Sequence, residues 1–302
     1  MQRRDFLQFT GAALLAGGAV ASFGAAALGP KPAAADAALR AKLAELEKRS
    51  GGRLGVSALD SGDGRRFDVR GGERFAMCST FKFLLSAAVL HKVDRGDLDL
   101  QQRIAVPKSA LVPHAPFTGP LAEAGGDASV AQLCEATMTL SDNPAANLLL
   151  PLVGNPDGLT RFLRGIGDPT TRLDRNEPEL NTAIPGDPRD TTSPNAMLAS
   201  MRALLLGDAL SAASRTQLAD WLIANKTGDK RLRAGLPKDW RIGDKTGSGN
   251  GTTNDIAIVW PSGRKPVFIV TYLTQATGED EQRSAILADA ARALFEHWIG
   301  AA

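Results

Sequence analysis

The chain has 302 residues, of which 43% are hydrophobic and 23% charged, an ordinary globular composition with room for one large domain or two packed subdomains. The formal net charge is +2, and basic residues are scattered among acidic ones, so no basic stripe predicts nucleic-acid binding. The only cysteines are Cys78 and Cys134, and the three histidines, His91, His114 and His297, lie at no metal-ligand spacing. We therefore expect no metal site built from His or Cys, and no cofactor.

The N-terminus has the pattern of an export signal. Gln2–Leu7 contains an arginine pair followed by Phe-Leu, and a Gly- and Ala-rich apolar run then extends from Gly11 to about Leu28. This order is typical of a twin-arginine signal. The alternative, a transmembrane anchor, is disfavoured because the run is shorter than about 18 strongly apolar residues. Small residues at 25–27 and 33–35 are both candidate cleavage sites. We assign residues 1–35 to the signal and expect a periplasmic or secreted protein without a stable membrane anchor.

The first elements of the mature chain are a helix and two short strands. Helical spacing of Ala and Leu predicts a helix from Asp36, a candidate N-cap, to Ser50. Residues 54–59 and 66–69 have strand-like patterns and are joined by a Gly- and Asp-rich turn.

The rest of the chain is helical in the middle and strand-rich near the end. The stretch from Phe75 to about Trp221 is mostly of helical pattern, with helices expected at 81–93, at 130–140 and from Asn143 onward, where proline occupies the first turn. Two β-branched runs separated by a Pro- and Gly-rich turn predict a hairpin, and an amphipathic helix closes the chain; these are residues 255–260, 267–273 and 282–298.

Strands at both ends and helices between them predict an α+β fold. We expect one antiparallel sheet built from both chain ends, flanked by helices, with an inserted, mostly helical subdomain. The sheet subdomain would comprise residues 36–75 and 222–302, and the helical subdomain residues 76–221. A functional site would form in the cleft between the two parts.

The string Ser79-Thr80-Phe81-Lys82 places a serine and a lysine three residues apart. On a helix that begins at Ser79, both side chains project from one face, and the helix N-terminus presents free N–H groups to Ser79. A serine hydroxyl is a weak nucleophile that needs a proton acceptor, and a lysine can serve if burial lowers its pKa. The pair alone is weak evidence, because Ser79 could equally be an N-cap and Lys82 a solvated residue.

Two further short strings have both structural and chemical interpretations. Ser141-Asp142-Asn143 lies at a helix–helix junction, where Asp142 or Asn143 could cap the following helix. Lys245-Thr246-Gly247 precedes a β-branched run and is expected on the strand at the edge of the cleft. Gly247 would let a substrate lie along the backbone, while Lys245, Thr246 and Ser248 could donate hydrogen bonds to a carboxylate.

The segment from Arg175 to Asp190 is polar and rich in proline, which is typical of a surface loop. Arg175 and Asp190 stand at its two ends and could form an ion pair that closes it. Glu177 and Asn181 are four residues apart, so one helical turn would let both hold a single water molecule.

Taken in their order along the chain, at 79–82, 141–143, 175–190 and 245–247, the four segments resemble the active site of the class A serine β-lactamases. The loop matches that family at Arg175, Glu177, Pro178, Leu180, Asn181 and Asp190. The resemblance implies that Ser79 attacks the lactam carbonyl, that Ser141 and Lys82 pass a proton to the ring nitrogen, and that Glu177, oriented by Asn181, activates the hydrolytic water. It leaves open whether Lys82 or Glu177 is the base for acylation. It also implies a cis bond between Glu177 and Pro178.

The resemblance assigns the remaining binding residues. Asn143 would donate to a substrate side-chain amide, and the backbone N–H groups of Ser79 and Ser248 would form an oxyanion hole. Arg231 matches the position from which some members bind the substrate carboxylate, although a surface arginine on a basic turn is a rival interpretation. His114 matches a rim position that is often aromatic, and its charge would vary with pH.

The cysteines depart from the family's two familiar disulfide bridges. The resemblance places one partner at Ser86, opposite Cys134, and the other near Ser248 and Gly249, opposite Cys78. Neither bridge can form, so two free, buried thiols are expected.

The predicted function is hydrolysis of the β-lactam ring of penicillin- or cephalosporin-type antibiotics through an acyl-serine, conferring antibiotic resistance, by a monomer that uses water as its second substrate. One alternative is a penicillin-binding D-Ala-D-Ala carboxypeptidase or transpeptidase, a class that lacks the Glu177 loop and stays acylated. Another is a non-catalytic β-lactam sensor, which would have no need of Lys82, Glu177 and Asn181.

Overall fold

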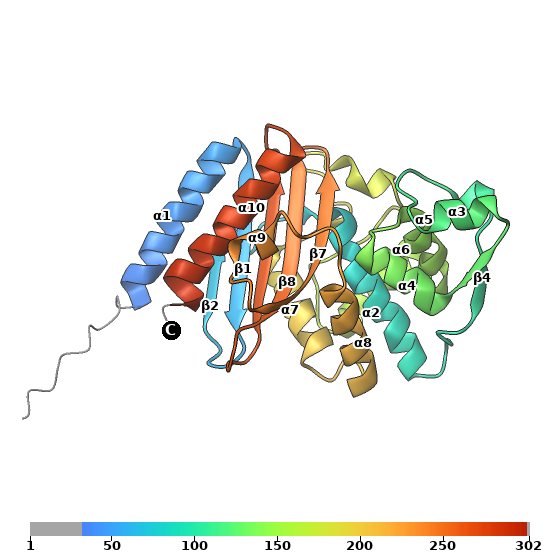
Figure 1. Ribbon diagram of the computed structural model, residues 1–302. Coiled ribbons are helices and arrows are strands. Elements are labelled where there is room, and N and C mark those ends of the chain that lie inside the picture. The colour runs from blue at the N-terminus through green and yellow to red at the C-terminus, as the bar shows by residue number, and fades with distance from the viewer. Residues whose placement is uncertain (1–31, 301–302) are drawn as a thin grey trace, which may run out of the picture.

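The computed structural model describes residues 32–300, so the predicted export signal lies outside the described residues except for its last four positions. Three layers make up the fold (Figure 1). Helices α1 (Pro32–Ser50) and α10 (Asp280–Leu294) cover one face of a five-stranded sheet, and a larger group of helices lies against the other face. Within residues 32–300 no helix is both long and apolar enough to cross a membrane.

The sheet is antiparallel and is built from both ends of the chain, as predicted. Its spatial order is β2-β1-β9-β8-β7. The strands are β1 (Arg53–Asp60), β2 (Arg66–Val69), β7 (Arg241–Gly249), β8 (Thr252–Trp260) and β9 (Val267–Thr274). β8 and β9 form the predicted hairpin, and β7 is an edge strand that carries Lys245. Lys245 thus lies on a strand, as predicted, and this strand is at the edge of the sheet.

Both faces of the sheet are buried, because helices cover each of them. Successive side chains of a strand point to opposite sides and so enter different cores. On β8, Ile256 and Ile258 join the core shared with the inserted helices, while Ala257 and Val259 pack toward α1 and α10. A strand covered on both faces reads as a continuous apolar run, which is why β8 and β9 stand out in the sequence.

The middle of the chain is mainly helical. Its helices are α2 (Phe81–Asp94), α3 (Thr118–Glu123), α4 (Val130–Thr139), α5 (Asn143–Leu149), α6 (Asn155–Gly165), α7 (Pro194–Leu205), α8 (Ala212–Ile223) and α9 (Leu232–Gly235). Four short strands pair as β3 (Phe75–Ala76) with β6 (Thr191–Thr192) and β4 (Arg103–Ala105) with β5 (Asp127–Ser129). The α5 helix starts as expected, because the Asp142 side chain accepts a hydrogen bond from the Ala145 N–H.

Two helix boundaries differ from the prediction. The N-cap role of Asp36 is wrong: α1 begins at Pro32, a residue well suited to a first turn, and Asp36 lies inside the helix. The closing helix begins at Asp280 rather than 282, because Glu279 and Gln282 form a capping box. Its last turn, Phe295–Ile299, widens into a π-helix.

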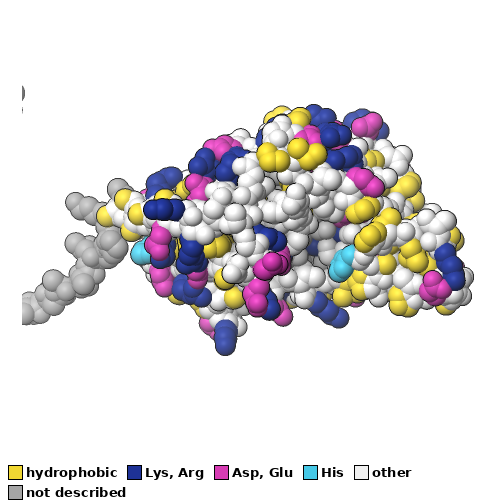
Figure 2. Space-filling model, turned by 90° about the horizontal axis from the view of Figure 1, so that it is seen from above, with side chains coloured by type: hydrophobic (Ala, Val, Ile, Leu, Met, Phe, Trp, Pro, Cys, Tyr) yellow, Lys and Arg dark blue, Asp and Glu magenta, His cyan; other side chains and the backbone are white. Residues whose placement is uncertain are grey.

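Charged side chains of both signs are interspersed over the face shown in Figure 2. The mixture agrees with the small net charge of +2.

Candidate active site

Ser79 lies at the N-terminal end of α2, in a short 3₁₀ turn (Cys78–Thr80) that runs directly into the helix. The Lys82 ammonium donates to Ser79 Oγ over 3.0 Å, so one turn brings the two side chains together as their spacing predicts. Lys82 is completely buried, while Ser79 keeps 9% of its surface exposed. A substrate arriving from solvent can therefore reach the Ser79 hydroxyl but not the Lys82 side chain.

Lys82 is surrounded by acceptors. Its Nζ lies 2.8 Å from the Ser141 carbonyl oxygen, 2.6 Å from Asn143 Oδ1 and 3.0 Å from Glu177 Oε1. Ser141 has a left-handed backbone (φ 59°), an uncommon conformation for a non-glycine residue. Burial lowers the pKa of Lys82, and the Glu177 carboxylate opposes that shift. A buried lysine with a lowered pKa is suited to accept and return a proton.

The loop from Arg175 to Asp190 is closed by the predicted ion pair. Arg175 Nε donates to Asp190 Oδ2 over 2.6 Å, and Asp190 Oδ1 accepts the backbone N–H groups of Asp174 and Arg175. The Glu177–Pro178 bond is cis, as the resemblance implied. A 3₁₀ turn at Glu179–Thr182 follows.

Glu177 reaches the nucleophile from this loop. Its carboxylate is 2% exposed, and Oε1 accepts from Ser79 Oγ over 3.2 Å. Its other oxygen, Oε2, accepts from Asn181 Nδ2. A carboxylate this close to Ser79, with an amide on its second oxygen, can hold and activate a water molecule beside an ester formed there.

Asn147, which the sequence analysis missed, holds the backbone of Glu177. Asn147 Nδ2 donates to the Glu177 carbonyl and Asn147 Oδ1 accepts the Glu177 N–H, each over 2.9 Å. Asn147 follows Asn143 by four residues on α5, so both amides lie on one helix face. That spacing was the available signal.

The β7 strand forms the opposite wall. Lys245 is fully buried and donates to Ser141 Oγ over 3.0 Å. Burial, reinforced by the neighbouring charge of Lys82, lowers the pKa of Lys245 well below its usual value. The two lysines therefore meet at Ser141, one on each side of its hydroxyl.

Two glycines on β7 permit very close backbone approach. A Cβ at Gly247 would lie 2.7 Å from the Met77 carbonyl oxygen and 3.1 Å from the Ser79 nitrogen. A Cβ at Gly249 would lie 2.6 Å from the Asn181 carbonyl oxygen and 2.7 Å from Cys78 Sγ. The strand thus touches both the turn of the nucleophile and the 175–190 loop.

Arg231 is a site residue by position, and its interpretation as a surface arginine is wrong. It is 6% exposed, and its Nη2 donates to Ser248 Oγ over 2.7 Å. Its Nη1 donates to the carbonyls of Gly247 (3.0 Å) and Asn254 (2.8 Å). The guanidinium therefore lies behind β7 and brings positive charge to the cleft.

A cleft of about 270 Å³ connects these groups. It is lined by Ser79, His114, Ser141, Asn143, Asn181, Thr227, Arg231, Thr246, Gly247 and Ser248. Nine of these residues come from the predicted site, and Thr227, whose hydroxyl pairs with that of Thr246 over 2.5 Å, is an addition. His114 has a left-handed backbone (φ 68°), and its Nε2 bonds the Leu140 carbonyl over 2.9 Å.

Cys78 and Cys134 are free and buried, as predicted. Burial raises the pKa of both thiols, so neither is a ready nucleophile.

Residues 38–298 match the sequence model described as the beta-lactamase enzyme family. The chain belongs to the class A β-lactamases. It is 50% identical over 306 residues to beta-lactamase L2 of Stenotrophomonas maltophilia, covering 99% of this chain and 100% of the relative. It is 49% identical over 256 residues to beta-lactamase CTX-M-8 of Citrobacter amalonaticus, covering 84% and 87% of the two chains.

Solved structures agree with this family. An ancestral (GNCA) class A beta-lactamase superimposes with a TM-score of 0.84 at 61% identity, covering 85% of this chain and 99% of that one. A beta lactamase from Xanthomonas campestris pv. campestris gives 0.85 at 57% identity, covering 87% and 98%. This class A β-lactamase is therefore a hydrolase of β-lactam rings that confers antibiotic resistance and works, as the class does, through an acyl-serine.

Proposed function

We propose that Ser79 is the nucleophile that opens the lactam ring. Its hydroxyl has two proton acceptors in reach, Lys82 at 3.0 Å and Glu177 at 3.2 Å, and either can take the proton during acylation. Ser141 then relays a proton from Lys82 to the departing ring nitrogen. The relay is supported by the Lys82–Ser141 Oγ distance of 3.3 Å and by Lys245 on the far side of that hydroxyl.

Hydrolysis of the acyl-serine is the step we assign to Glu177. A water held by Glu177 and Asn181 would lie next to the ester on Ser79, and the carboxylate would remove its proton as it attacks. The single observation that carries this assignment is the 3.2 Å contact between Glu177 Oε1 and Ser79 Oγ. It also favours a hydrolase over the two alternatives, a transpeptidase that stays acylated and a sensor that does not react.

Substrate binding falls to the β7 wall. Thr246 and Ser248 line the cleft and can donate to the substrate carboxylate, with Lys245 and Arg231 supplying positive charge behind them. The oxyanion would be held by the N–H groups of Ser79 and Ser248.

Two further contacts with the substrate are proposed on the other side of the cleft. Asn143 Nδ2 already donates to the Pro113 carbonyl over 2.8 Å, so its second N–H is the one that would bind a substrate amide. His114 would contact the substrate at the rim.

We also propose that the chain is exported through its twin-arginine signal and acts as a periplasmic or secreted monomer. Ala35 is buried within α1, which supports processing at 25–27, because a cut after Ala35 would remove the first turn of that helix. Processing at 25–27 would make the signal shorter than the assigned residues 1–35 and leave α1 whole. Beyond residue 35, the mature protein would consist of a sheet subdomain (about 36–75 and 222–302) and a helical subdomain (about 76–221).

Nitrocefin turnover tests the proposed function. Many cycles per enzyme molecule are expected, because the ester is hydrolysed as well as formed. A single burst equal to the enzyme concentration would indicate a transpeptidase-like protein, and binding without colour change would indicate a sensor. Either result would overturn the proposal.

A further inference from the structure

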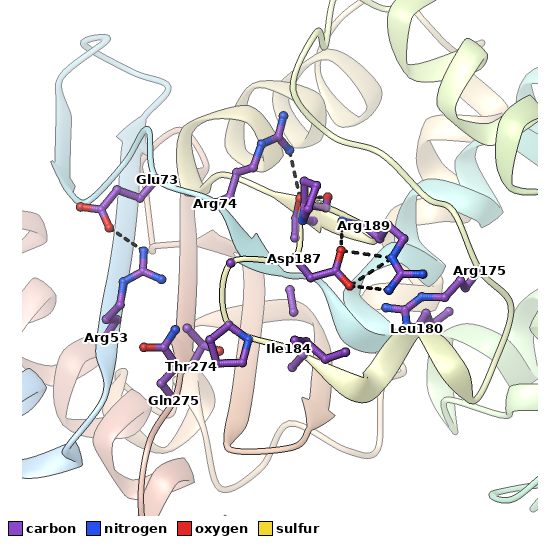
Figure 3. A pocket seen from close by; sticks show the side chains of 16 residues that line it. Arg53, Glu73, Arg74, Arg175, Leu180, Ile184, Asp187, Arg189, Thr274 and Gln275 are labelled. Atoms are coloured by element: carbon purple, nitrogen blue, oxygen red, sulfur yellow. Dashed lines mark hydrogen bonds and ion pairs between the residues drawn. The ribbon is translucent and has the colours of Figure 1, made fainter.

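A second cavity, of about 320 Å³, is lined by the 175–190 loop (Figure 3), which also borders the catalytic cleft through Asn181. Its walls come from the start of β1, the segment around β3, the loop itself and the end of β9. The volume is within the usual range of small-molecule sites. None of the residues assigned to catalysis or substrate binding lines this cavity.

Four arginines line the cavity, two from the 175–190 loop and two from elsewhere in the chain: Arg175, Arg189, Arg53 and Arg74 (Figure 3). Only two carboxylates, those of Glu73 and Asp187, share the lining. The lining side chains thus include two more cations than anions, but Asp190 lies outside the lining and forms an ion pair with Arg175. Among the described residues, Arg74 is the one lining arginine without a carboxylate partner.

The two carboxylates are already occupied. Glu73 accepts from Arg53 over 2.5 Å and from Arg70 over 2.9 Å. Asp187 accepts both Nε and Nη2 of Arg189 as well as its backbone N–H. Acceptors facing the cavity are thus largely satisfied by residues of the protein.

The guanidinium groups, by contrast, have donors to spare. Within residues 32–300, Arg74 bonds only through Nη1, to the Thr170 carbonyl (2.9 Å) and Thr191 Oγ1 (3.0 Å), leaving Nε and Nη2 without partners. Arg175 uses Nε and Nη1, and its Nη2 has no partner in the described part of the chain. A surplus of donors and positive charge calls for a ligand rich in acceptors and negative charge.

One part of the loop, residues 180–185, gives the cavity an apolar wall. This wall is formed by Leu180, Ala183, Ile184 and Pro185. Ile184 is 51% exposed and is one of the two exposed large hydrophobic residues in the described part of the chain. A ligand that fits both features has an apolar body and more than one anionic group.

The cavity shares its wall with the catalytic cleft. Leu180 faces the cavity and the next residue, Asn181, lines the cleft, while Arg175 is two residues from Glu177. Arg53 and Arg74 belong to the sheet side, whereas Arg175 and Arg189 belong to the loop. An anion that bridges the two sides would hold the loop against the sheet.

We propose that this cavity is an effector site for a small dicarboxylate with an apolar body, which clamps the 175–190 loop in its closed position. Binding to the cavity does not depend on the catalytic roles proposed above, but its consequence for hydrolysis rests on the role of Glu177. Because the ligand binds the closed loop better than an open one, it shifts the population toward the closed loop by its differential affinity.

Calorimetry with isophthalate tests the site. The wild-type chain is expected to bind one equivalent, and Arg74→Gln and Arg189→Gln are each expected to weaken binding about tenfold or more, as the loss of a charge-assisted hydrogen bond does. Benzoate, with one carboxylate, is expected to bind much more weakly. The matched control is Arg202→Gln, an exposed arginine of α7 outside this cavity, which should bind as the wild type does.

Hydrogen exchange tests the clamp. At ten times the dissociation constant, amides of residues 179–189 are expected to exchange up to about tenfold more slowly, because the ligand must leave before the loop opens. Unchanged loop exchange on binding would overturn the clamp.

Three results would overturn the site itself. They are no binding at millimolar isophthalate, binding by both arginine variants as tight as that of the wild type, and purely competitive inhibition of nitrocefin hydrolysis, which would place the ligand in the catalytic cleft. Arg189 is an exposed residue whose replacement is not expected to affect folding, so its variant remains informative if Arg74→Gln is unstable. Nitrocefin turnover without isophthalate reports separately on the proposed function.

Discussion

Replacing Glu177 by glutamine should separate formation of the acyl-serine from its hydrolysis. The amide keeps the size of the carboxylate, but it cannot take a proton from water. The local hydrogen bonds can rearrange, because Asn181 Oδ1 is buried and has no partner within residues 32–300. If the Asn181 amide turned over, this oxygen would accept a hydrogen bond from the new Nε2 of the glutamine. Lys82 loses the neighbouring carboxylate that raises its pKa, so it becomes easier to keep neutral in its buried site.

The expected effect is confined to the second step. A positioned general base contributes about 100- to 10,000-fold, which corresponds to about 3–5 kcal/mol of activation free energy. Acylation should stay measurable, since Lys82 lies 3.0 Å from Ser79 Oγ. Stopped-flow mixing with nitrocefin should then give one burst per enzyme, followed by turnover slowed by that factor.

Intact mass spectrometry supplies the direct readout. The Glu177→Gln variant should carry the mass of one substrate molecule after mixing, whereas the wild type should be free of adduct within the same time. Glu179→Gln is the matched control, because this exposed glutamate lies two residues further along the same loop and should retain full turnover. Rapid multiple turnover by Glu177→Gln, or a variant that forms no adduct at all, would refute the division of roles described here.

The remaining predictions concern the nucleophile, the cleft charge and a buried carboxyl. Ser79→Ala should form no adduct and hydrolyse nothing, as followed by intact mass and nitrocefin absorbance; surviving hydrolysis would identify a different nucleophile. Arg231→Gln should lower kcat/KM about 10- to 100-fold, mainly through KM, because a charge-assisted contact is lost. Lys230 is an exposed neighbour paired with Glu281, and Lys230→Gln should change neither kcat nor KM. Equal effects of the two substitutions would argue against a substrate contact of Arg231. Burial raises the pKa of Asp255 well above its usual value, and the charge of Asp244 raises it further. The folded state therefore binds this proton more tightly than the unfolded state does. As pH rises from about 4 toward the raised pKa, the group's contribution to the free energy of unfolding falls. The Asp255→Asn side chain does not titrate. The free energy of unfolding of this variant in urea, minus that of the wild type, should therefore increase between pH 5 and pH 8. A difference that does not change with pH would contradict the raised pKa.

Short-range chemistry made much of the site predictable. Ser79 and Lys82 meet because three residues make nearly one helical turn, and Glu177 meets Asn181 because four residues do the same. The position of Lys245 on a strand followed from the β-branched run after it. In these cases one local geometry decides the contact, so the sequence alone is sufficient.

Contacts that depend on distant segments were harder to predict. Asn147 binds the backbone of Glu177, 30 positions away. Its spacing from Asn143 places it on the same helix face but does not identify Glu177 as its partner. Arg231 resembles a surface arginine locally and is buried only because β7 and α10 pack around it. The cavity behind the loop requires four separate chain segments, so no single stretch of sequence could have revealed it.

The contact at Gly249 has a consequence for how this enzyme can change. The strand, the turn before the nucleophile and the hydrolytic loop converge where a single methyl group does not fit. The approach of β7 to the loop and to the nucleophile's turn is therefore limited by the Asn181 carbonyl and the Cys78 side chain. Substitutions that adapt the enzyme to new antibiotics are then better tolerated at rim residues such as His114. Any side chain larger than hydrogen at position 249 would push β7 away from the 175–190 loop and from the turn that carries Ser79.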